Sequence, residues 1–189
     1  MSDAVSALAG ASYDGFVRVK EMGLCGMITL RGDLALAGVQ KAVKAAVGTD
    51  MPGQRQIVSN GDKAVAWMSP DELLLMVPHG EVEDVIAGLQ KALKGVHFLA
   101  VNVSDARAVF RISGADVRDV IAKLVPVDLS AAGFGTGDFR RTRMAQVPAA
   151  FWMPDGDSVQ IVCFRSVATY VFGLLKDAAE AGGEVGFHG

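Results

Sequence analysis

The sequence predicts an α+β fold in which two repeated strand–helix–hairpin–helix units build a mostly antiparallel sheet with helices packed on it. One observation is that short apolar or alternating runs, typical of strands, are separated by turns and by amphipathic helical patterns. The other is that the order recurs: Trp67 and Met68 precede a Pro-Asp turn and an apolar strand, and so do Trp152 and Met153. We therefore expect an internal duplication whose halves each cover a sheet face with their own helices.

An arm, 1–22, precedes the first repeat, which we place at 23–95. In the arm, Val17 and Val19 alternate with basic residues, which is typical of a short edge strand. The repeat begins with a strand at 26–32. A helix follows, and its apolar residues recur at helical spacing: Leu34, Val39, Val43 and Val47.

The first repeat continues with a hairpin and a second helix. The runs 64–68 and 73–78 are two apolar strands joined by a turn that contains Pro70 and Asp71. The helix after them ends at Gly95. Its apolar face consists of Val82, Val85, Ile86, Leu89 and Leu93.

The second repeat, 96–182, follows the same order and leaves a short tail, 183–189. Its first two strands are expected at 97–105 and 106–113, followed by a helix that Pro126 closes. A glycine-rich loop leads to the last strands and to a helix that Ser166 caps. These strands are expected at 139–147, 149–153 and 158–164.

The two tryptophans are expected to serve the same purpose in the two repeats. Trp67 and Trp152 each stand at a strand end before a turn, so we interpret them as equivalent core anchors. We also expect the two units to join their sheets into one layered structure.

The composition excludes several classes of protein. Hydrophobic residues make up 51% and charged residues 21% of the 189 residues, which excludes a disordered chain. The net charge of −3 argues against a nucleic-acid-binding protein, because such proteins need a basic surplus. No apolar run is long enough for a membrane span, and the N-terminus lacks the basic region of a secretory signal. The mean hydropathy of +0.32 therefore predicts apolar surface that a protein partner covers.

No catalytic or metal-binding constellation emerges from the residue types. His79, His97 and His188 lack metal-ligand spacing and are interpreted as solvated loop residues. Cys25 and Cys163 do not form a C-x-x-C pair, which favours buried free thiols in a reducing cytoplasm. We expect no catalytic, cofactor-binding or metal-binding residue on this chain.

A glycine-rich loop and a basic strand form the candidate partner interface. The loop contains Gly133, Gly135 and Gly137, but it precedes a strand, whereas a phosphate-binding loop opens a helix. We expect it to be a flexible connection. The strand after it carries Arg140, Arg141 and Arg143, with the last two on one face. We expect this loop and these arginines to rim a patch that binds an acidic or anionic partner.

Several segments together resemble the gamma subunits of heterotetrameric sarcosine oxidases. They are CGMITLRGD, AWMSPDELLLMVP, VNVSDARAVFRISGADVRDVIAKLVPVDL and FRSVATYVFGLLKDAA, which extend from about Leu24 to about Ala179. No single segment is a catalytic signature, but their order and spacing are those of this family.

The resemblance implies a fold related to the folate-binding domains of aminomethyltransferases. It also implies partners, namely the alpha, beta and delta subunits of a complex that oxidatively demethylates sarcosine to glycine. That reaction releases hydrogen peroxide and formaldehyde, or transfers the one-carbon unit to tetrahydrofolate. FAD, FMN, NAD and tetrahydrofolate are expected on the partner subunits and none on this chain, which is expected to be inactive alone.

Two alternatives belong to other functional classes. The chain could be a stand-alone folate-binding protein of the aminomethyltransferase type, which needs an acidic residue to hold the pterin ring. It could also be a regulatory ferredoxin-like module. A non-catalytic assembly subunit in the cytoplasm is the preferred interpretation.

Overall fold

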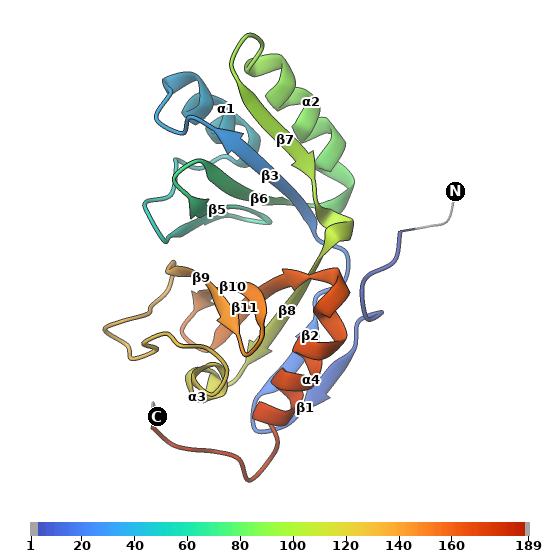
Figure 1. Ribbon diagram of the computed structural model, residues 1–189, viewed down its shortest axis with the longest axis vertical. Coiled ribbons are helices and arrows are strands. Elements are labelled where there is room, and N and C mark those ends of the chain that lie inside the picture. The colour runs from blue at the N-terminus through green and yellow to red at the C-terminus, as the bar shows by residue number, and fades with distance from the viewer. Residues whose placement is uncertain (1–3, 188–189) are drawn as a thin grey trace. The chain divides into compact units, whose positions relative to one another are not determined.

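The computed structural model describes residues 4–187 and consists of two compact units (Figure 1). The central unit comprises Leu24–Ser104. The terminal unit combines the residues up to Gly23 with those from Asp105 onward. Each unit has its own antiparallel sheet and its own helices, so the α+β class is confirmed. The expectation that the two sheets join is wrong, because the strands form two separate sheets.

The central unit has a five-stranded sheet in the order β4-β5-β6-β3-β7 and two helices. Its elements are β3 (Gly26–Gly32), α1 (Ala37–Val47), β4 (Ile57–Asn60), β5 (Lys63–Ser69), β6 (Glu72–Val77), the short 3-10 helix at His79–Glu81, α2 (Val82–Ala92) and β7 (Phe98–Asn102). Alternate strand residues pack against the apolar stripes of the helices. The core residues are Ile28, Leu30, Val39, Val43, Val65, Leu73, Leu75, Ile86 and Leu89.

The helix α1 ends where the sequence predicts. Gly48 adopts a positive φ of 76°, and its backbone N–H donates to the carbonyl of Lys44 at 2.8 Å. A residue with a Cβ is strained in this left-handed conformation, so glycine suits the end of the helix.

The terminal unit has a six-stranded sheet in the order β1-β2-β8-β11-β10-β9 and two helices. Its elements are β1 (Ser12–Asp14), β2 (Arg18–Glu21), β8 (Arg107–Ser113), α3 (Val117–Ala122), β9 (Phe139–Met144), β10 (Val147–Asp155), β11 (Ser158–Phe164), the 3-10 helix at Arg165–Val167 and α4 (Ala168–Ala178). A further 3-10 helix, Ser104–Ala106, connects β7 to β8. The core residues include Phe110, Ile112, Val120, Phe151, Ile161, Val171 and Leu175.

The two sheets share one strand order. Read from β4, the central sheet is β4-β5-β6-β3-β7, and read from β9, the terminal sheet is β9-β10-β11-β8-β2-β1. All of these neighbours are antiparallel. The two units therefore match strand for strand, except that β1 has no counterpart in the central unit. This order is what an internal duplication requires, and the duplication itself stays a prediction.

The unit boundaries differ from those that the sequence predicts. The first boundary falls after Ser104 instead of after Gly95, because β7 pairs with β3 of the central sheet. The segment 1–22 is not a separate arm in its described part, since β2 pairs with β8 (Arg18 opposite Ser113). Periodicity along the chain predicts that a strand exists, but not which distant strand it pairs with.

A buried carboxylate explains why the N-terminal segment belongs to the terminal unit. Glu21 is only 1% exposed. Its carboxylate accepts hydrogen bonds from the Ser6 hydroxyl at 2.9 Å and from the backbone N–H groups of Leu8 at 3.2 Å and Gly10 at 2.6 Å. A buried charge needs such partners, so the segment before β1 folds back onto β2.

The strands after the glycine-rich loop also differ from the prediction. The expected strand 139–147 is interrupted by a tight turn at Ala145, which has a positive φ of 47°. The expected turn at Pro154 and Asp155 is part of β10, and the hairpin turn lies one step later, between Asp155 and Ser158.

This shift places the two tryptophans at different positions in their hairpins. Trp67 stands opposite Leu73, a core residue, and is half-buried. Trp152 stands opposite Gln160 and is 3% exposed. It alternates with core residues of β10 and therefore lies on the sheet face away from α3 and α4. The register does not support treating them as equivalent core anchors.

We expect the two tryptophans to differ in their contribution to stability. Trp152 is buried and stacks on Phe139 with ring centroids 6.0 Å apart. Trp152→Ala should therefore lower the free energy of unfolding by about 3–5 kcal/mol, and Trp67→Ala by roughly half of that or less. Urea denaturation of both variants measures the difference, and equal losses would contradict this assignment.

Candidate functional site

The basic strand of the candidate interface, β9, forms an edge of the terminal sheet. Its side chains alternate between the two sheet faces. Arg141 and Arg143 are exposed and lie on the same face, as the sequence predicts. Arg140 lies on the opposite face and is half-buried. The structure therefore brings Arg141 and Arg143 together and assigns Arg140 to the adjoining loop.

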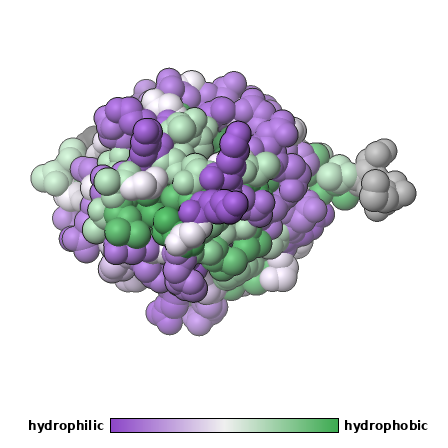
Figure 2. Space-filling view, turned by 90° about the horizontal axis from the view of Figure 1, so that it is seen from above, coloured by the Kyte–Doolittle hydropathy of each residue, from purple (hydrophilic) through white to green (hydrophobic). Residues whose placement is uncertain are grey.

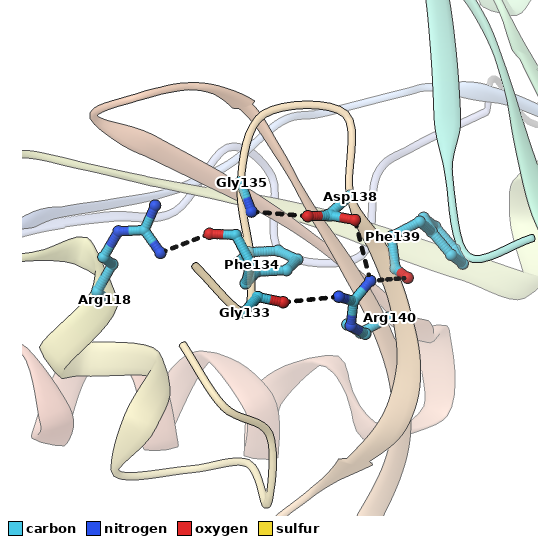
Figure 3. Close-up of polar contacts among 7 residues, drawn as sticks. All are labelled: Arg118, Gly133, Phe134, Gly135, Asp138, Phe139 and Arg140. Atoms are coloured by element: carbon cyan, nitrogen blue, oxygen red, sulfur yellow. Dashed lines mark hydrogen bonds and ion pairs between the residues drawn. The ribbon is translucent and has the colours of Figure 1, made fainter. Parts of the chain in front are cut away.

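The glycine-rich loop is held by an arginine that sequence analysis did not single out. Arg118, from α3, donates through Nη1 to the carbonyls of Leu129 and Phe134, both at 2.7 Å. Its Nη2 lies 3.3 Å from the sulfur of Met153 in β10. The guanidinium thus ties the loop to both the helix and the sheet. Figure 3 shows its bond to the Phe134 carbonyl. In the sequence, the signal for such a role is weak: Arg118 directly follows Val117, which belongs to the apolar face of a predicted helix.

A second set of contacts holds the loop from the β9 side (Figure 3). Arg140 donates through Nη2 to the carbonyl of Gly133 at 2.8 Å and pairs with the Asp138 carboxylate at 3.3 Å. The other carboxylate oxygen of Asp138 accepts the backbone N–H of Gly135 at 2.8 Å. The guanidinium carbon of Arg140 also lies 5.4 Å from the ring centroid of Phe134. Arg140 and Asp138 therefore satisfy the polar groups of the loop backbone.

The loop is consequently an ordered part of the terminal core, and the expectation of a flexible connection is wrong. Phe134 is 1% exposed and meets Phe151 edge-on, with centroids 5.1 Å apart. A Cβ on Gly133 would lie 2.5 Å from an Asp128 carboxylate oxygen, and Gly137 has a φ of 83°. A side chain at Gly133 would therefore displace the Asp128 carboxylate, and the positive φ at Gly137 favours glycine.

The surroundings of Cys163 make its thiol unreactive. Cys163 is buried in β11, and this burial raises the pKa of its thiol to about 12, while the Arg107 guanidinium lowers the pKa to a lesser extent. It is therefore a protonated, unreactive thiol at neutral pH. His79 begins a 3-10 helix and His97 is exposed. His188 lies outside the described residues.

No metal-binding cluster exists within residues 4–187, where three or more His, Cys, Asp or Glu side chains never gather closely enough. In the same part of the chain, no helix is long and apolar enough to cross a membrane. The buried acidic residues of this part are all engaged. Glu21 binds the N-terminal segment, Glu72 pairs with Arg31 at 3.4 Å, and Asp119 accepts the backbone N–H of Gly186 at 2.7 Å.

The central unit has several surface hollows. A groove of about 440 Å³ between α1 and α2 is lined mainly by small residues, among them Ala42, Ala46 and Gly88. A cleft of about 650 Å³ lies at the start of β7. It is lined by Arg31, Gly32, Asp33, Asp71, His97, Phe98 and Leu99. No serine, threonine or cysteine lines the groove or the cleft.

The loop contacts lead to a test of Arg118. Arg118→Met keeps the aliphatic stem and removes the donors, which leaves two backbone carbonyls without their charged partner. We expect a loss of about 2–3 kcal/mol in the free energy of unfolding and faster proteolysis within 129–137. The matched control, Arg143→Met at an exposed position, should change stability by less than about 0.5 kcal/mol. Equal behaviour of the two variants would refute the role of Arg118.

Comparison with known protein sequences gives one consistent family. The model of the family described as "Sarcosine oxidase, gamma subunit family" matches residues 31–181. The sarcosine oxidase subunit gamma of Corynebacterium sp. (strain P-1) is 29% identical over 174 residues, which cover 91% of this chain and 84% of that protein. The sarcosine oxidase subunit gamma of an Arthrobacter species is 31% identical over 148 residues, covering 77% and 71%.

Solved structures give the same result for the fold. A chain of the heterotetrameric sarcosine oxidase from Corynebacterium sp. U-96, in complex with pyrrole 2-carboxylate, matches with a TM-score of 0.79 and 26% identity. The match covers 86% of this chain and 83% of that chain. The glycine cleavage system aminomethyltransferase T from Bartonella henselae matches with a TM-score of 0.61 and 13% identity, covering 85% of this chain and 46% of that chain. The latter likeness concerns the fold alone.

Proposed function

Because the chain belongs to the sarcosine oxidase gamma subunit family, we propose that it is a non-catalytic assembly subunit of a heterotetrameric sarcosine oxidase. The observation that carries this proposal is its similarity, over most of both chains, to one chain of a solved heterotetrameric sarcosine oxidase. The complex would demethylate sarcosine oxidatively to glycine, with hydrogen peroxide and either formaldehyde or methylene-tetrahydrofolate as products.

In this proposal the cofactors belong to the partner subunits. FAD, FMN, NAD and tetrahydrofolate would bind to the alpha, beta and delta chains, and this chain would supply contacts that hold them together. The low reactivity of Cys163, and the absence of serine, threonine and cysteine from the lining of the groove and the cleft, support a role outside the chemistry. The two free cysteines suit assembly in a reducing cytoplasm.

A stand-alone folate-binding protein is less well supported. Such a site needs a carboxylate that is available to hold the pterin ring, and the three buried acidic residues of the described chain already have intramolecular partners. The aminomethyltransferase likeness, at 13% identity, extends to the fold and not to a ligand site.

Reconstitution tests the proposal directly. The purified chain should show no flavin absorbance and should form no peroxide from sarcosine. When it carries an affinity tag and is co-expressed with sarcosine oxidase alpha, beta and delta subunits, it should capture a complex that has both properties. A chain that binds flavin by itself, or that captures none of these subunits, would contradict an assembly role.

Arg141 and Arg143 are proposed to contact an acidic surface of the large subunits, since both are exposed on one face of an edge strand. Arg141→Glu combined with Arg143→Glu should weaken capture about ten-fold, mainly through slower association at low salt, with an unchanged melting temperature. A variant with Lys41→Glu and Lys94→Glu, which reverses two exposed charges of the central unit, is the control. Equal capture by both variants would move the contact away from β9.

A further inference from the structure

The strand β7 leaves an apolar edge of the central sheet uncovered. It pairs with β3 on one side, and no other strand within residues 4–187 pairs with it. Leu99 is 51% and Val101 is 40% exposed, and both lie on the sheet face away from α1 and α2. Their neighbours Phe98 and Ala100 point the other way and pack against the core.

The other edges are protected in ways that β7 is not. The edge strand β9 carries three arginines, β4 is four residues long and ends in exposed polar residues, and β1 has three residues. By contrast, β7 has five residues, of which none is charged and none is proline. Exposed apolar edge strands of this kind tend to pair with a strand of another chain, so proteins normally protect or cover them.

The terminal unit shows what occupies the corresponding edge. There, β2 stands next to β8 as β7 stands next to β3, and β1 covers the outer side of β2 as an additional antiparallel strand. The residues of β2 that point away from the helices are Arg18 and Lys20, which suit solvent. At the matching positions β7 has Leu99 and Val101, as the pairing with the central strands shows. Thus β2, whose outward side chains are charged, is covered by β1, whereas no strand of residues 4–187 covers β7, whose outward side chains are apolar.

The backbone of β7 is oriented to accept such a strand. Val103 donates its N–H to the carbonyl of Met27 at 2.8 Å, so this pair is hydrogen-bonded. In an antiparallel ladder the hydrogen-bonded pairs alternate, which directs the main-chain groups of Leu99 and Val101 toward β3. The N–H and C=O of Ala100, between them, therefore point outward.

The cleft beside this edge is lined by both apolar and charged residues. Figure 2 looks down on the end of Figure 1 where α1, α2 and β7 lie, and it shows apolar residues gathered in the middle of that face with hydrophilic residues around them. The cleft of about 650 Å³ lies at the start of β7, where Leu99 lines it. Its charges are partly balanced, because Arg31 pairs with Asp71 at 3.7 Å and with Glu72 at 3.4 Å.

We propose that an extended segment of a partner subunit adds to β7 as the sixth strand of the central sheet. The segment runs antiparallel to β7, as β1 runs to β2, and hydrogen-bonds to the main chain of Ala100. It is uncharged along about five residues and lays alternate apolar side chains on Leu99 and Val101. This inference rests on the proposed assembly function and names the surface and the kind of partner segment that it uses.

The first test replaces the two apolar residues by those that β2 has at matching positions. In the co-expression assay, Leu99→Arg combined with Val101→Lys should reduce capture of the large subunits about ten-fold or more. The fold should persist, since β2 carries these residues in a folded sheet, but the melting temperature should fall slightly because Leu99→Arg sets a positive charge opposite Arg31. An acidic pair, Leu99→Glu with Val101→Glu, should reduce capture equally. Both pairs of substitutions remove the same apolar surface and differ only in the sign of the charge that they introduce. Tyr170→Arg, at an exposed position of α4, is the control and should capture normally.

The second test separates strand addition from a mere surface contact. In the assembled complex, amide hydrogen exchange of Ala100 should slow about ten-fold or more relative to the free chain, while Leu99 and Val101 should be protected in both states. Ala100→Pro removes the outward N–H, which an edge strand tolerates, and should abolish capture without unfolding the sheet. Leu99→Pro removes an inward N–H and should destabilise the free chain, which verifies the orientation.

The outcomes distinguish this inference from the proposed function. If the unmodified chain captures no large subunit, the assembly function fails and the inference fails with it. If the unmodified chain and the Leu99 and Val101 variants capture equally, the function stands and the β7 inference is wrong. If β7 instead mediates dimers of this chain, gel filtration of the free protein shows a dimer that the same variants dissociate, which would also overturn the proposed occupant.

Discussion

Each unit depends on the pairing of one of its inner strands with a strand that is far away in the sequence. In the terminal unit, β8 lies between β11 and β2, and β2 comes from the far N-terminal part of the chain. In the central unit, β7 returns after α2 to complete the sheet beside β3. Without these pairings, β8 and β3 would themselves be edges, with apolar residues such as Phe110 and Leu30 beside unpaired backbone.

Polar contacts at the periphery of the terminal unit follow from this arrangement. The segment before β2 must return along the sheet, and buried Glu21 holds it there through three hydrogen bonds. The long connection from α3 to β9 is fixed in a comparable way by Arg118 and Arg140, whose guanidinium groups satisfy carbonyls that the loop cannot satisfy by itself. The charged residues nearest the glycine-rich loop thus stabilise the fold, whereas Arg141 and Arg143 are exposed on the other face of β9.

The described part of the fold presents surfaces that suit binding. Its one strongly shifted thiol, Cys163, is protonated and buried, and its buried carboxylates have structural partners. The edges of the two sheets differ in chemistry, with arginines on β9 and apolar residues on β7. A subunit that contributes through contacts needs this kind of difference, because charge guides association and apolar area stabilises the contact.

The sequence by itself determined the α+β class and most strands and helices, because periodicity is a property of short segments. It also determined the family, because the order of the segments can be read directly along the chain. It also indicated that Arg141 and Arg143 share a face, which follows from the two-residue repeat of a strand. The tertiary structure alone decided that β7 pairs with β3 and β2 with β8, and that the sheets stay separate. It likewise decided that the glycine-rich loop is ordered and that Trp67 and Trp152 lie in different registers. Pairing partners, bulges and guanidinium contacts join residues that are far apart in the chain, and no local pattern specifies which distant backbone a strand or a charge will meet.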